Sequence, residues 1–130
     1  VRPAEVMVLG GGVVGLNAAR MAMGMGADVT IFDRSLPRLK YIDELYGDRL
    51  NTLYSTDEAI DQHLATVDLV IGAVLIPGAS APKLITREEL KLMLRANAFE
   101  LVETRKIVYP ADPDSGDGDS WDWLTVARRV

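Results

Sequence analysis

The sequence of 130 residues contains no cysteine, a single histidine and few aromatic residues, which make up 6% of the chain. The absence of cysteine excludes a disulfide framework, a thiol nucleophile and a cysteine-ligated zinc site. His63 has no cluster of partner residues for catalysis, so we expect a solvated helical histidine and not a catalytic base. A chain without cysteine fits the reducing cytoplasm, which is the location we expect.

An excess of positive charge is also absent, since the formal net charge is −5. This balance argues against a basic surface for nucleic acid or for an anionic membrane. The longest apolar run, residues 69–77, is too short to span a bilayer, and no secretory signal peptide is visible before the first predicted strand. We therefore expect neither nucleic acid nor a membrane as a partner. The chain begins with valine, which suggests a piece of a longer protein.

What is present is a strand, a glycine turn, a helix and a second strand within residues 5–33. Gly10, Gly12 and Gly15 fit the pattern G-x-G-x-x-G. The first glycine permits a tight turn out of the strand, the second lets the backbone approach a pyrophosphate, and the third lets the helix pack close to the sheet. The alternative is a glycine turn that serves only packing.

The surroundings of this turn predict a dinucleotide site. The N-terminus of the helix presents free N–H groups and a positive dipole end to phosphates. Asp33 follows Gly15 by 18 residues and ends the second strand, where a carboxylate accepts hydrogen bonds from the ribose hydroxyls. We expect NAD to be preferred over NADP, because Asp33 would repel a 2′-phosphate, although Arg34 and Arg38 could hold that phosphate.

Apolar spacing predicts the helices that follow. In a helix over residues 14–25, the residues expected to face the sheet are Val14, Ala18, Met21 and Met25, with the methionines filling the core and Gly26 ending the helix. Ser35 is a candidate N-cap of a second helix, which Gly47 ends. The apolar stripe of that helix consists of Leu36, Leu39, Ile42, Leu45 and Tyr46.

The next segment reads as a short strand over residues 50–54, a capping box and a buried strand. Ser55 and Glu58 form the box, and the helix behind it is expected to pack through Ile60, Leu64 and Val67. Residues 67–74 are nearly all apolar, as in a parallel strand that is buried on both faces. A loop over residues 75–83 and a second box over residues 86–89 then precede a helix with Leu90, Met93 and Leu94 on one side.

The β–α alternation up to residue 94 predicts an α/β fold of the Rossmann type. We expect a doubly wound parallel sheet with strand order 3-2-1-4 between two helical layers. The ligand would lie across the carboxyl ends of the first and fourth strands. Its expected contacts are Gly12, Val13 and Val14 on one side and Val74 and Leu75 on the other.

Several segments resemble the NAD(H)-binding domain of bacterial L-alanine dehydrogenases. They are Val8–Gly15, Asp28–Leu39, Asp43–Gly47, Ala73–Ala79 and Ala81–Leu84. The resemblance covers residues 2–94, and the transhydrogenase α-subunit domain is a poorer match. It implies NAD as cofactor, oxidative deamination of L-alanine to pyruvate and ammonia by the whole enzyme, and a homo-oligomer.

The resemblance also implies roles for individual residues. Asp33 would hold the adenosine ribose, Arg38 would lie near the adenosine, and Ser55 would lie near the adenine. Val74 and Leu75 would lie against the adenosine and nicotinamide sides of the cleft. The plainer alternatives are that Ser55 only caps a helix and that Arg38 is only solvated.

Two parts of the family pattern are missing. The catalytic lysine and histidine of the family belong to a substrate domain that this sequence does not contain. Residues 98–105 stand where the family has an apolar strand and an Asp-Gln-Gly-Gly-like loop, and they do not match. We therefore assign no catalytic residue. The hypotheses are the cofactor half of an alanine dehydrogenase and a stand-alone regulatory module that binds NAD(H) without chemistry.

Residues 95–130 are expected to form an extension of their own beyond the domain of residues 1–94. Alternation around Phe99 and Leu101 predicts an edge strand, and residues 107–109 are a second candidate. Residues 112–119 form an acidic loop whose glycine register does not fit an EF-hand. A short helix capped by Ser120 is expected to dock through Trp121, with Leu124 and Ala127 or Arg128 on the same face. A shifted reading frame, which predicts a disordered tail, is the alternative.

Overall fold

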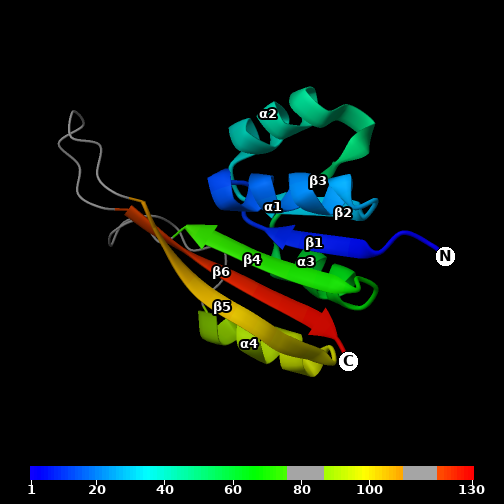
Figure 1. The fold of residues 1–130 in the computed structure, drawn as a ribbon, viewed down its shortest axis with the longest axis vertical. Coiled ribbons are helices and arrows are strands. Elements are labelled where there is room, and N and C mark those ends of the chain that lie inside the picture. The colour runs from blue at the N-terminus through cyan, green and yellow to red at the C-terminus, as the bar shows by residue number, and fades with distance from the viewer. Residues whose placement is uncertain (76–86, 110–119) are drawn as a thin grey trace.

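The computed structural model describes residues 1–75, 87–109 and 120–130, which form one mixed sheet with helices on both faces (Figure 1). The elements in chain order are β1 (Glu5–Leu9), α1 (Val13–Gly24), β2 (Asp28–Asp33), α2 (Leu36–Tyr46), the 3₁₀ turn η1 (Gly47–Arg49), β3 (Asn51–Tyr54), α3 (Asp57–Leu64), β4 (Leu69–Leu75), α4 (Arg87–Ala96), β5 (Phe99–Tyr109) and β6 (Ser120–Arg129).

The strand order is β3-β2-β1-β4-β6-β5. The first four strands pair in parallel in the order 3-2-1-4, which confirms the predicted Rossmann-type arrangement. Strand β6 runs antiparallel to both of its neighbours, β4 and β5. Figure 1 shows β6 between the other two strands.

The core has two layers because both faces of the parallel strands are buried. In β1, Met7 and Leu9 join the cluster under α3 and α4, whereas Val6 and Val8 join the cluster under α1 and α2. All four residues of β1 after Glu5 are buried. This near-continuous apolar run places the glycine turn at the end of a central strand.

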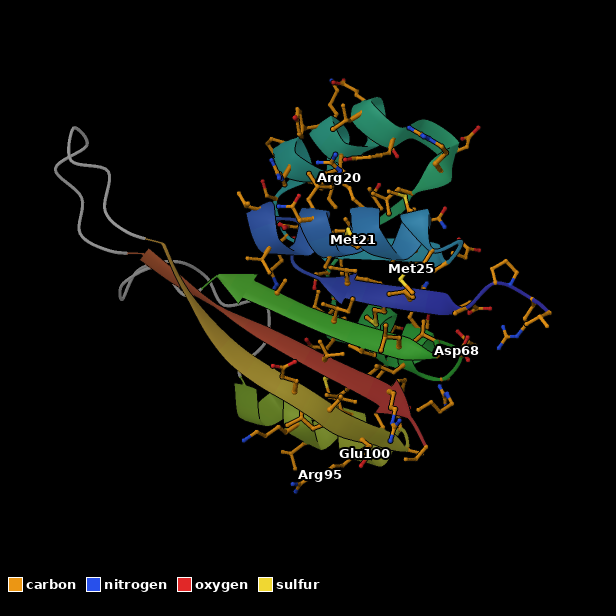
Figure 2. All side chains as sticks on the ribbon, viewed as in Figure 1. Arg20, Met21, Met25, Asp68, Arg95 and Glu100 are labelled. Carbon is orange, nitrogen blue, oxygen red and sulfur yellow. The ribbon has the colours of Figure 1, made fainter. Side chains whose placement is uncertain are left out.

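The set of residues predicted to face the sheet from helix α1 was partly wrong, because Ala18 packs against the core but Met21 and Met25 do not. The buried residues are Gly15, Ala19 and Ala22, whereas Met21 is 70% exposed and Met25 is 86% exposed (Figure 2). Small side chains on the inner face let the helix axis approach the sheet closely, so Met21 and Met25 lie outside, whereas Met23 packs against the core cluster as predicted. The prediction for the end of this helix is confirmed, because Gly26 has φ +85° directly after it.

Helix α2 begins as predicted, since the Ser35 hydroxyl accepts a hydrogen bond from the Arg38 N–H at 3.3 Å. Gly47 follows its last turn with φ +53°. The apolar stripe was partly wrong, because Leu39 and Ile42 are buried while Leu36 and Leu45 are exposed. The two exposed leucines lie near opposite ends of the helix.

The capping box predicted for helix α3 was wrong by one residue. Thr56 is the N-cap, and its Oγ1 accepts from the Ala59 N–H at 3.1 Å. Ile60, Leu64 and Val67 are buried as predicted. His63 is half-buried and so only partly solvated: its ring meets the Phe32 ring edge-on at 5.0 Å, and its Nδ1 lies 3.1 Å from the Ala59 carbonyl oxygen.

The predicted edge strand is confirmed, since β5 is the last strand of the sheet. The predicted short helix after Ser120 was wrong, because residues 120–129 form strand β6. Phe99 and Ala127 are buried in the cluster that α4 covers. Glu100 and Arg128 are exposed and form an ion pair at 3.1 Å. Leu101 and Val102 of β5 are exposed as well, so within residues 99–103 the core contact of β5 comes from Phe99.

Other predictions lie outside the described residues. They concern the loop of residues 75–83 beyond Leu75, the second capping box, the acidic loop of residues 112–119, and the side chains of Leu90, Trp121 and Leu124. In helix α4, Leu94 is buried and Met93 packs beside it, as predicted. No helix in the described part of the chain has the length and apolar character needed to cross a membrane.

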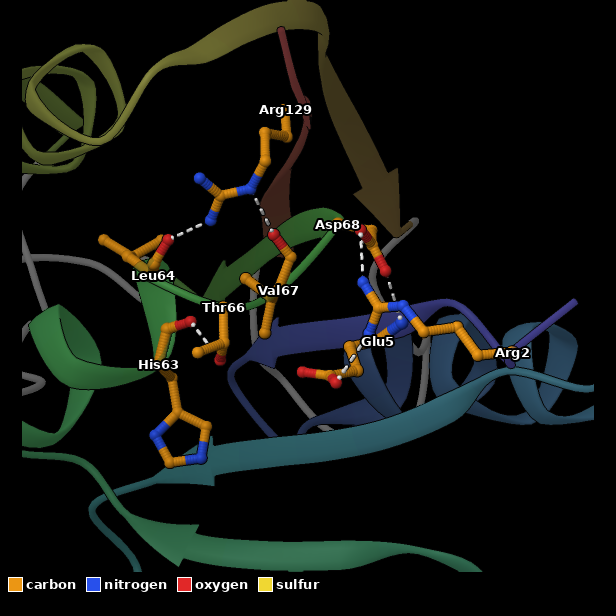
Figure 3. Close-up of polar contacts among 8 residues, drawn as sticks. All are labelled: Arg2, Glu5, His63, Leu64, Thr66, Val67, Asp68 and Arg129. Atoms are coloured by element: carbon orange, nitrogen blue, oxygen red, sulfur yellow. Dashed lines mark hydrogen bonds and ion pairs between the residues drawn. The ribbon is translucent and has the colours of Figure 1, made fainter.

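Polar contacts join the segment between α3 and β4 to residues near both ends of the chain (Figure 3). Arg129 of β6 donates from Nη2 to the Leu64 carbonyl at 2.6 Å and from Nε to the Val67 carbonyl at 3.0 Å. On the other side of this segment, the Asp68 carboxylate accepts from the Glu5 N–H at 3.0 Å and from Arg2 at 3.4 Å. The segment between α3 and β4 is therefore held by both ends of the chain.

Candidate functional site

The glycine turn lies at the carboxyl end of β1, next to the carboxyl ends of β2 and β4. Gly10 has φ +102°, a conformation that side chains rarely adopt, and its N–H donates to the Phe32 carbonyl at 2.8 Å. A Cβ added at Gly15 would overlap the Gly10 carbonyl oxygen and lie 3.3 Å from the Ala73 Cβ. Both glycines therefore have the structural roles predicted for them.

Helix α1 begins at this turn without a side-chain cap. Gly12 is the N-cap residue, no side chain in the described part of the chain accepts from the first N–H groups, and the first turn contains no acidic residue. A Cβ added at Gly12 would meet no atom within 4 Å, and Val13 is exposed. An uncapped and accessible helix N-terminus has N–H donors and positive potential for an anion.

Asp33 lies beside the turn at the end of β2. Its Oδ2 accepts from the Gly11 N–H at 2.7 Å, and its Oδ1 accepts from the Ser35 N–H at 2.8 Å. Each carboxylate oxygen has a second lone pair that can accept from a hydroxyl group. The acid is half-buried, so its orientation is fixed while access to ligand remains.

Arg38, in the first turn of α2, reaches back to the same turn. Its Nε donates to the Gly11 carbonyl at 2.5 Å, and its guanidinium lies 5.2 Å from the centre of the Tyr41 ring. The side chain is half-buried. Arg38 therefore lies against the glycine turn and is not simply solvated.

Ser55 follows β3 and lies at the same edge of the sheet. Its N–H donates to the Asp33 carbonyl at 2.9 Å, which fixes the residue beside the acid. The side chain is 2% exposed, and its Oγ has no hydrogen-bond partner among the residues that the structure describes. A buried hydroxyl without a partner is costly, so this oxygen fits a site that a polar ligand group completes.

Strand β4 extends past the turn on the other side. Leu9 of β1 is in register with Gly72, so Ala73, Val74 and Leu75 continue beyond the end of β1. The backbone of Val74 and Leu75 therefore lies on the β4 side of the glycine turn, as predicted. Their side chains lie outside the described residues.

Comparison with known proteins adds independent information about this arrangement. The family model described as "Alanine dehydrogenase/PNT, C-terminal domain" matches residues 1–97. The chain belongs to this family. The predicted resemblance is thereby confirmed, and the chain is homologous to the NAD-binding domain of alanine dehydrogenases.

Curated relatives of this family give the extent of the match. The chain is 57% identical over 93 residues to an alanine dehydrogenase of Halomonas elongata, which covers 72% of the chain and 25% of the relative. It is 52% identical over 89 residues to an alanine dehydrogenase of Bacillus subtilis, covering 68% of the chain and 24% of the relative. The chain thus spans about a quarter of the length of the curated relatives it matches.

Two solved structures match the chain to different extents. An L-alanine dehydrogenase structure matches with a TM-score of 0.60 and 44% identity, covering 70% of the chain and 25% of that structure. A putative methyltransferase from Thermoplasma acidophilum matches 99% of the chain and 70% of that structure, with a TM-score of 0.55 and 14% identity. At this low identity the second match indicates only a shared fold, which includes the hairpin beyond the alanine dehydrogenase/PNT domain.

The sequence analysis missed one residue of the alanine dehydrogenase/PNT site. A Cβ added at Gly11 would lie 2.9 Å from the Ile42 Cδ1 and 3.2 Å from the Asp33 Oδ2, so a side chain at this position would press on both residues. The signal was present as three consecutive glycines, of which the motif uses only two. Within residues 1–75, 87–109 and 120–130, no group of acidic residues and histidine is arranged to hold a metal ion.

Proposed function

We propose that this chain binds NAD(H) across the carboxyl ends of β1, β2 and β4. The single observation that carries the proposal is the uncapped N-terminus of α1 beside Asp33. The turn offers N–H donors for the pyrophosphate, and the carboxylate lies where a ribose would meet it. The family match supports the same cofactor.

The residues of this site have separate roles in the proposal. Gly12, Val13 and Val14 line the pyrophosphate, with Gly10 and Gly15 shaping the turn. Asp33 accepts hydrogen bonds from the ribose hydroxyls through the lone pairs that Gly11 and Ser35 leave unused. Ser55 supplies its unpartnered Oγ on the adenosine side, and Arg38 supports the turn. Val74 and Leu75 border the adenosine and nicotinamide sides of the cleft.

NAD is the preferred cofactor in this proposal. A 2′-phosphate would lie against the Asp33 carboxylate, whose two oxygens are fixed by backbone N–H groups. Arg34 and Arg38 are the cations that could hold such a phosphate, and Arg38 already donates to the Gly11 carbonyl. Like charges at a fixed acid therefore disfavour NADP.

The wider role that we propose is the cofactor domain of an L-alanine dehydrogenase-like oxidoreductase. The bound NAD accepts a hydride from L-alanine, and pyruvate and ammonia are released. This activity requires a substrate domain as partner, because the chain spans about a quarter of its relatives' length. We infer a homo-oligomer from the alanine dehydrogenase relatives and a cytoplasmic location from the lack of cysteine.

A second candidate is a regulatory module that binds NAD(H) without chemistry. The observation that favours it is the β5–β6 hairpin, which lies beyond the family match and pairs with β4 along seven residue positions. In this reading residues 95–130 form an extension that completes the sheet of the cofactor domain. The two candidates share the binding site and differ in turnover.

Titration calorimetry of the purified chain with NADH tests the proposal. We expect saturable binding to the wild type, no binding to Gly12→Val, and weaker binding of NADPH. A folded sample that gives no heat with millimolar NADH would contradict the binding site. Adding L-alanine and NAD then separates the two candidates, because alanine-dependent NADH formation above the Gly12→Val control would contradict the module.

A further inference from the structure

Gly11 is the residue of the turn whose two backbone polar groups are both held by side chains. Its N–H donates to Asp33 Oδ2 at 2.7 Å, and its carbonyl accepts from Arg38 Nε at 2.5 Å. The two side chains come from the end of β2 and from the first turn of α2. The side chains of Asp33 and Arg38 therefore hold the turn by two hydrogen bonds on the side that faces α2.

The hydrogen bond from Arg38 to the Gly11 carbonyl fixes the direction of the Gly12 N–H. No peptide bond in the described residues is cis, so the carbonyl of Gly11 and the N–H of Gly12 point in opposite directions across one planar unit. Because Arg38 holds the carbonyl toward α2, the Gly12 N–H points away from α2. A rotation of this peptide would break the bond to Arg38.

The turn lacks the means to fix this peptide by itself. Residues 10–12 are all glycine, which has more backbone freedom than any other residue. An added Cβ at Gly11 would lie 2.9 Å from Ile42 Cδ1, so the turn packs closely against α2 at this position. The orientation of the Gly11–Gly12 peptide therefore depends on contacts from outside the turn.

Arg38 is itself well anchored for this task. Its own N–H donates to the Ser35 hydroxyl, and the Ser35 N–H donates to Asp33 Oδ1. Asp33, Ser35, Arg38 and Gly11 thus form a closed ring of hydrogen bonds. The guanidinium also lies over the Tyr41 ring one turn further along α2.

We propose that Arg38 is a positioning residue of the phosphate site, which holds the Gly11–Gly12 peptide so that the Gly12 N–H is presented to the anion. The inference rests on the proposed binding of NAD(H). It assigns to Arg38 a task distinct from contact with the adenosine, because the group that it orients belongs to the pyrophosphate side.

Two replacements at the same position separate a hydrogen bond from a charge. Glutamine carries a donor nitrogen on Cδ, as arginine does, whereas methionine has no donor there, and both are neutral. We expect Arg38→Met to bind ADP about tenfold more weakly, as the loss of a hydrogen bond to a charged donor implies. Arg38→Gln should retain most of the affinity. Lys40→Met, on the exposed side of α2, is the control for lost charge.

Adenosine is the probe that separates positioning from direct contact. Calorimetry should give equal adenosine affinity for the wild type and Arg38→Met, because adenosine has no phosphate. If Arg38→Met weakens adenosine as much as ADP, or if the glutamine and methionine variants lose ADP affinity equally, the proposal is overturned.

Amide spectra of the free protein test the peptide without any ligand. In ¹⁵N-labelled samples the Gly12 signal should shift in Arg38→Met and stay near its wild-type position in Arg38→Gln and Lys40→Met. An unchanged Gly12 signal in Arg38→Met would overturn the positioning role. Absence of ADP and NADH binding in the wild type would instead contradict the proposed function, and the spectra would still decide the role of Arg38.

Discussion

The guanidinium of Arg129 lies over the ring of Phe99, with 4.9 Å between its Cζ and the ring centre. From this position its nitrogens donate to the backbone carbonyls of Leu64, Val67 and Asn97. One side chain near the end of β6 therefore connects the end of α3, the segment before β4 and the start of β5. Its charge is compensated by carbonyl dipoles and an aromatic face.

Loss of this arginine should destabilise the fold. Arg129→Met leaves buried carbonyls without their donor, so we expect the free energy of unfolding to fall by about 2–3 kcal/mol. Urea denaturation followed by circular dichroism measures the change. Arg128→Met is the matched control, because Arg128 forms only an exposed ion pair with Glu100, and its loss should cost about 0–1 kcal/mol. Equal losses for the two variants would contradict this role of Arg129.

The second and third glycines of the motif, Gly12 and Gly15, should separate binding from folding. Gly12→Ala should fold with nearly wild-type stability, since an added Cβ meets no atom within 4 Å, but should lose NADH affinity. Gly15→Ala should lose roughly 3 kcal/mol or more, because its Cβ would overlap the Gly10 carbonyl oxygen. Thermal unfolding and calorimetry on both variants check the pair. A Gly12→Ala variant that binds NADH normally would be evidence against a pyrophosphate at the turn.

Asp33 should govern the choice between NAD and NADP. Asn at this position keeps one acceptor oxygen, so it cannot accept from both the Gly11 and Ser35 N–H groups as the carboxylate does. We expect Asp33→Asn to weaken NADH binding about tenfold and NADPH binding less. The ratio of the two dissociation constants is the measurement, and Asp43→Asn on the exposed face of α2 is the control. An unchanged ratio would mean that Asp33 does not face the 2′ position.

Ser55 and Thr56 should respond in opposite ways to alanine. Thr56→Ala removes the N-cap of α3 and should lower the free energy of unfolding by about 1 kcal/mol. Ser55→Ala removes a buried hydroxyl that has no partner, so stability should stay level or rise by up to about 1 kcal/mol. NADH affinity should fall in Ser55→Ala alone. A destabilised Ser55→Ala variant would restore the capping role that the sequence suggests.

The parallel half of the fold could be predicted because its signals are local. Gly10 adopts a positive φ, Gly15 packs under the first strand, and Ser35 caps α2, all as the sequence indicates. Each of these residues satisfies a requirement of the backbone, namely a positive φ, a close approach or a helix cap, that arises within a few positions of it in the sequence. The order 3-2-1-4 then follows from the handedness of the connections.

The wrong predictions concern residues whose structure is determined by contacts with residues distant in the sequence. Met21 and Met25 were predicted for the inner face of α1, but the close approach of helix and sheet requires the small residues Gly15, Ala19 and Ala22 there. Ser55 and Thr56 are both good caps, and the bond of the Ser55 N–H to Asp33 leaves Thr56 to cap the helix. Residues 120–129 have a spacing that suits a helix, yet they pair with β4 and β5. Gly11 was missed because its neighbours Ile42 and Asp33 are distant in sequence.

The position of β6 has a consequence for folding of the nascent chain during translation. Strand β4 borders β1 on one side, and its other side pairs with residues 122–128, which are translated more than 45 residues later. Until those residues leave the exit tunnel, the nascent sheet presents an apolar strand with unused backbone donors and acceptors. Such an edge attracts other chains and the chaperones that guard against them. Completion of this sheet therefore follows the synthesis of its parallel strands, and sequence separation, not any single weak contact, sets that delay.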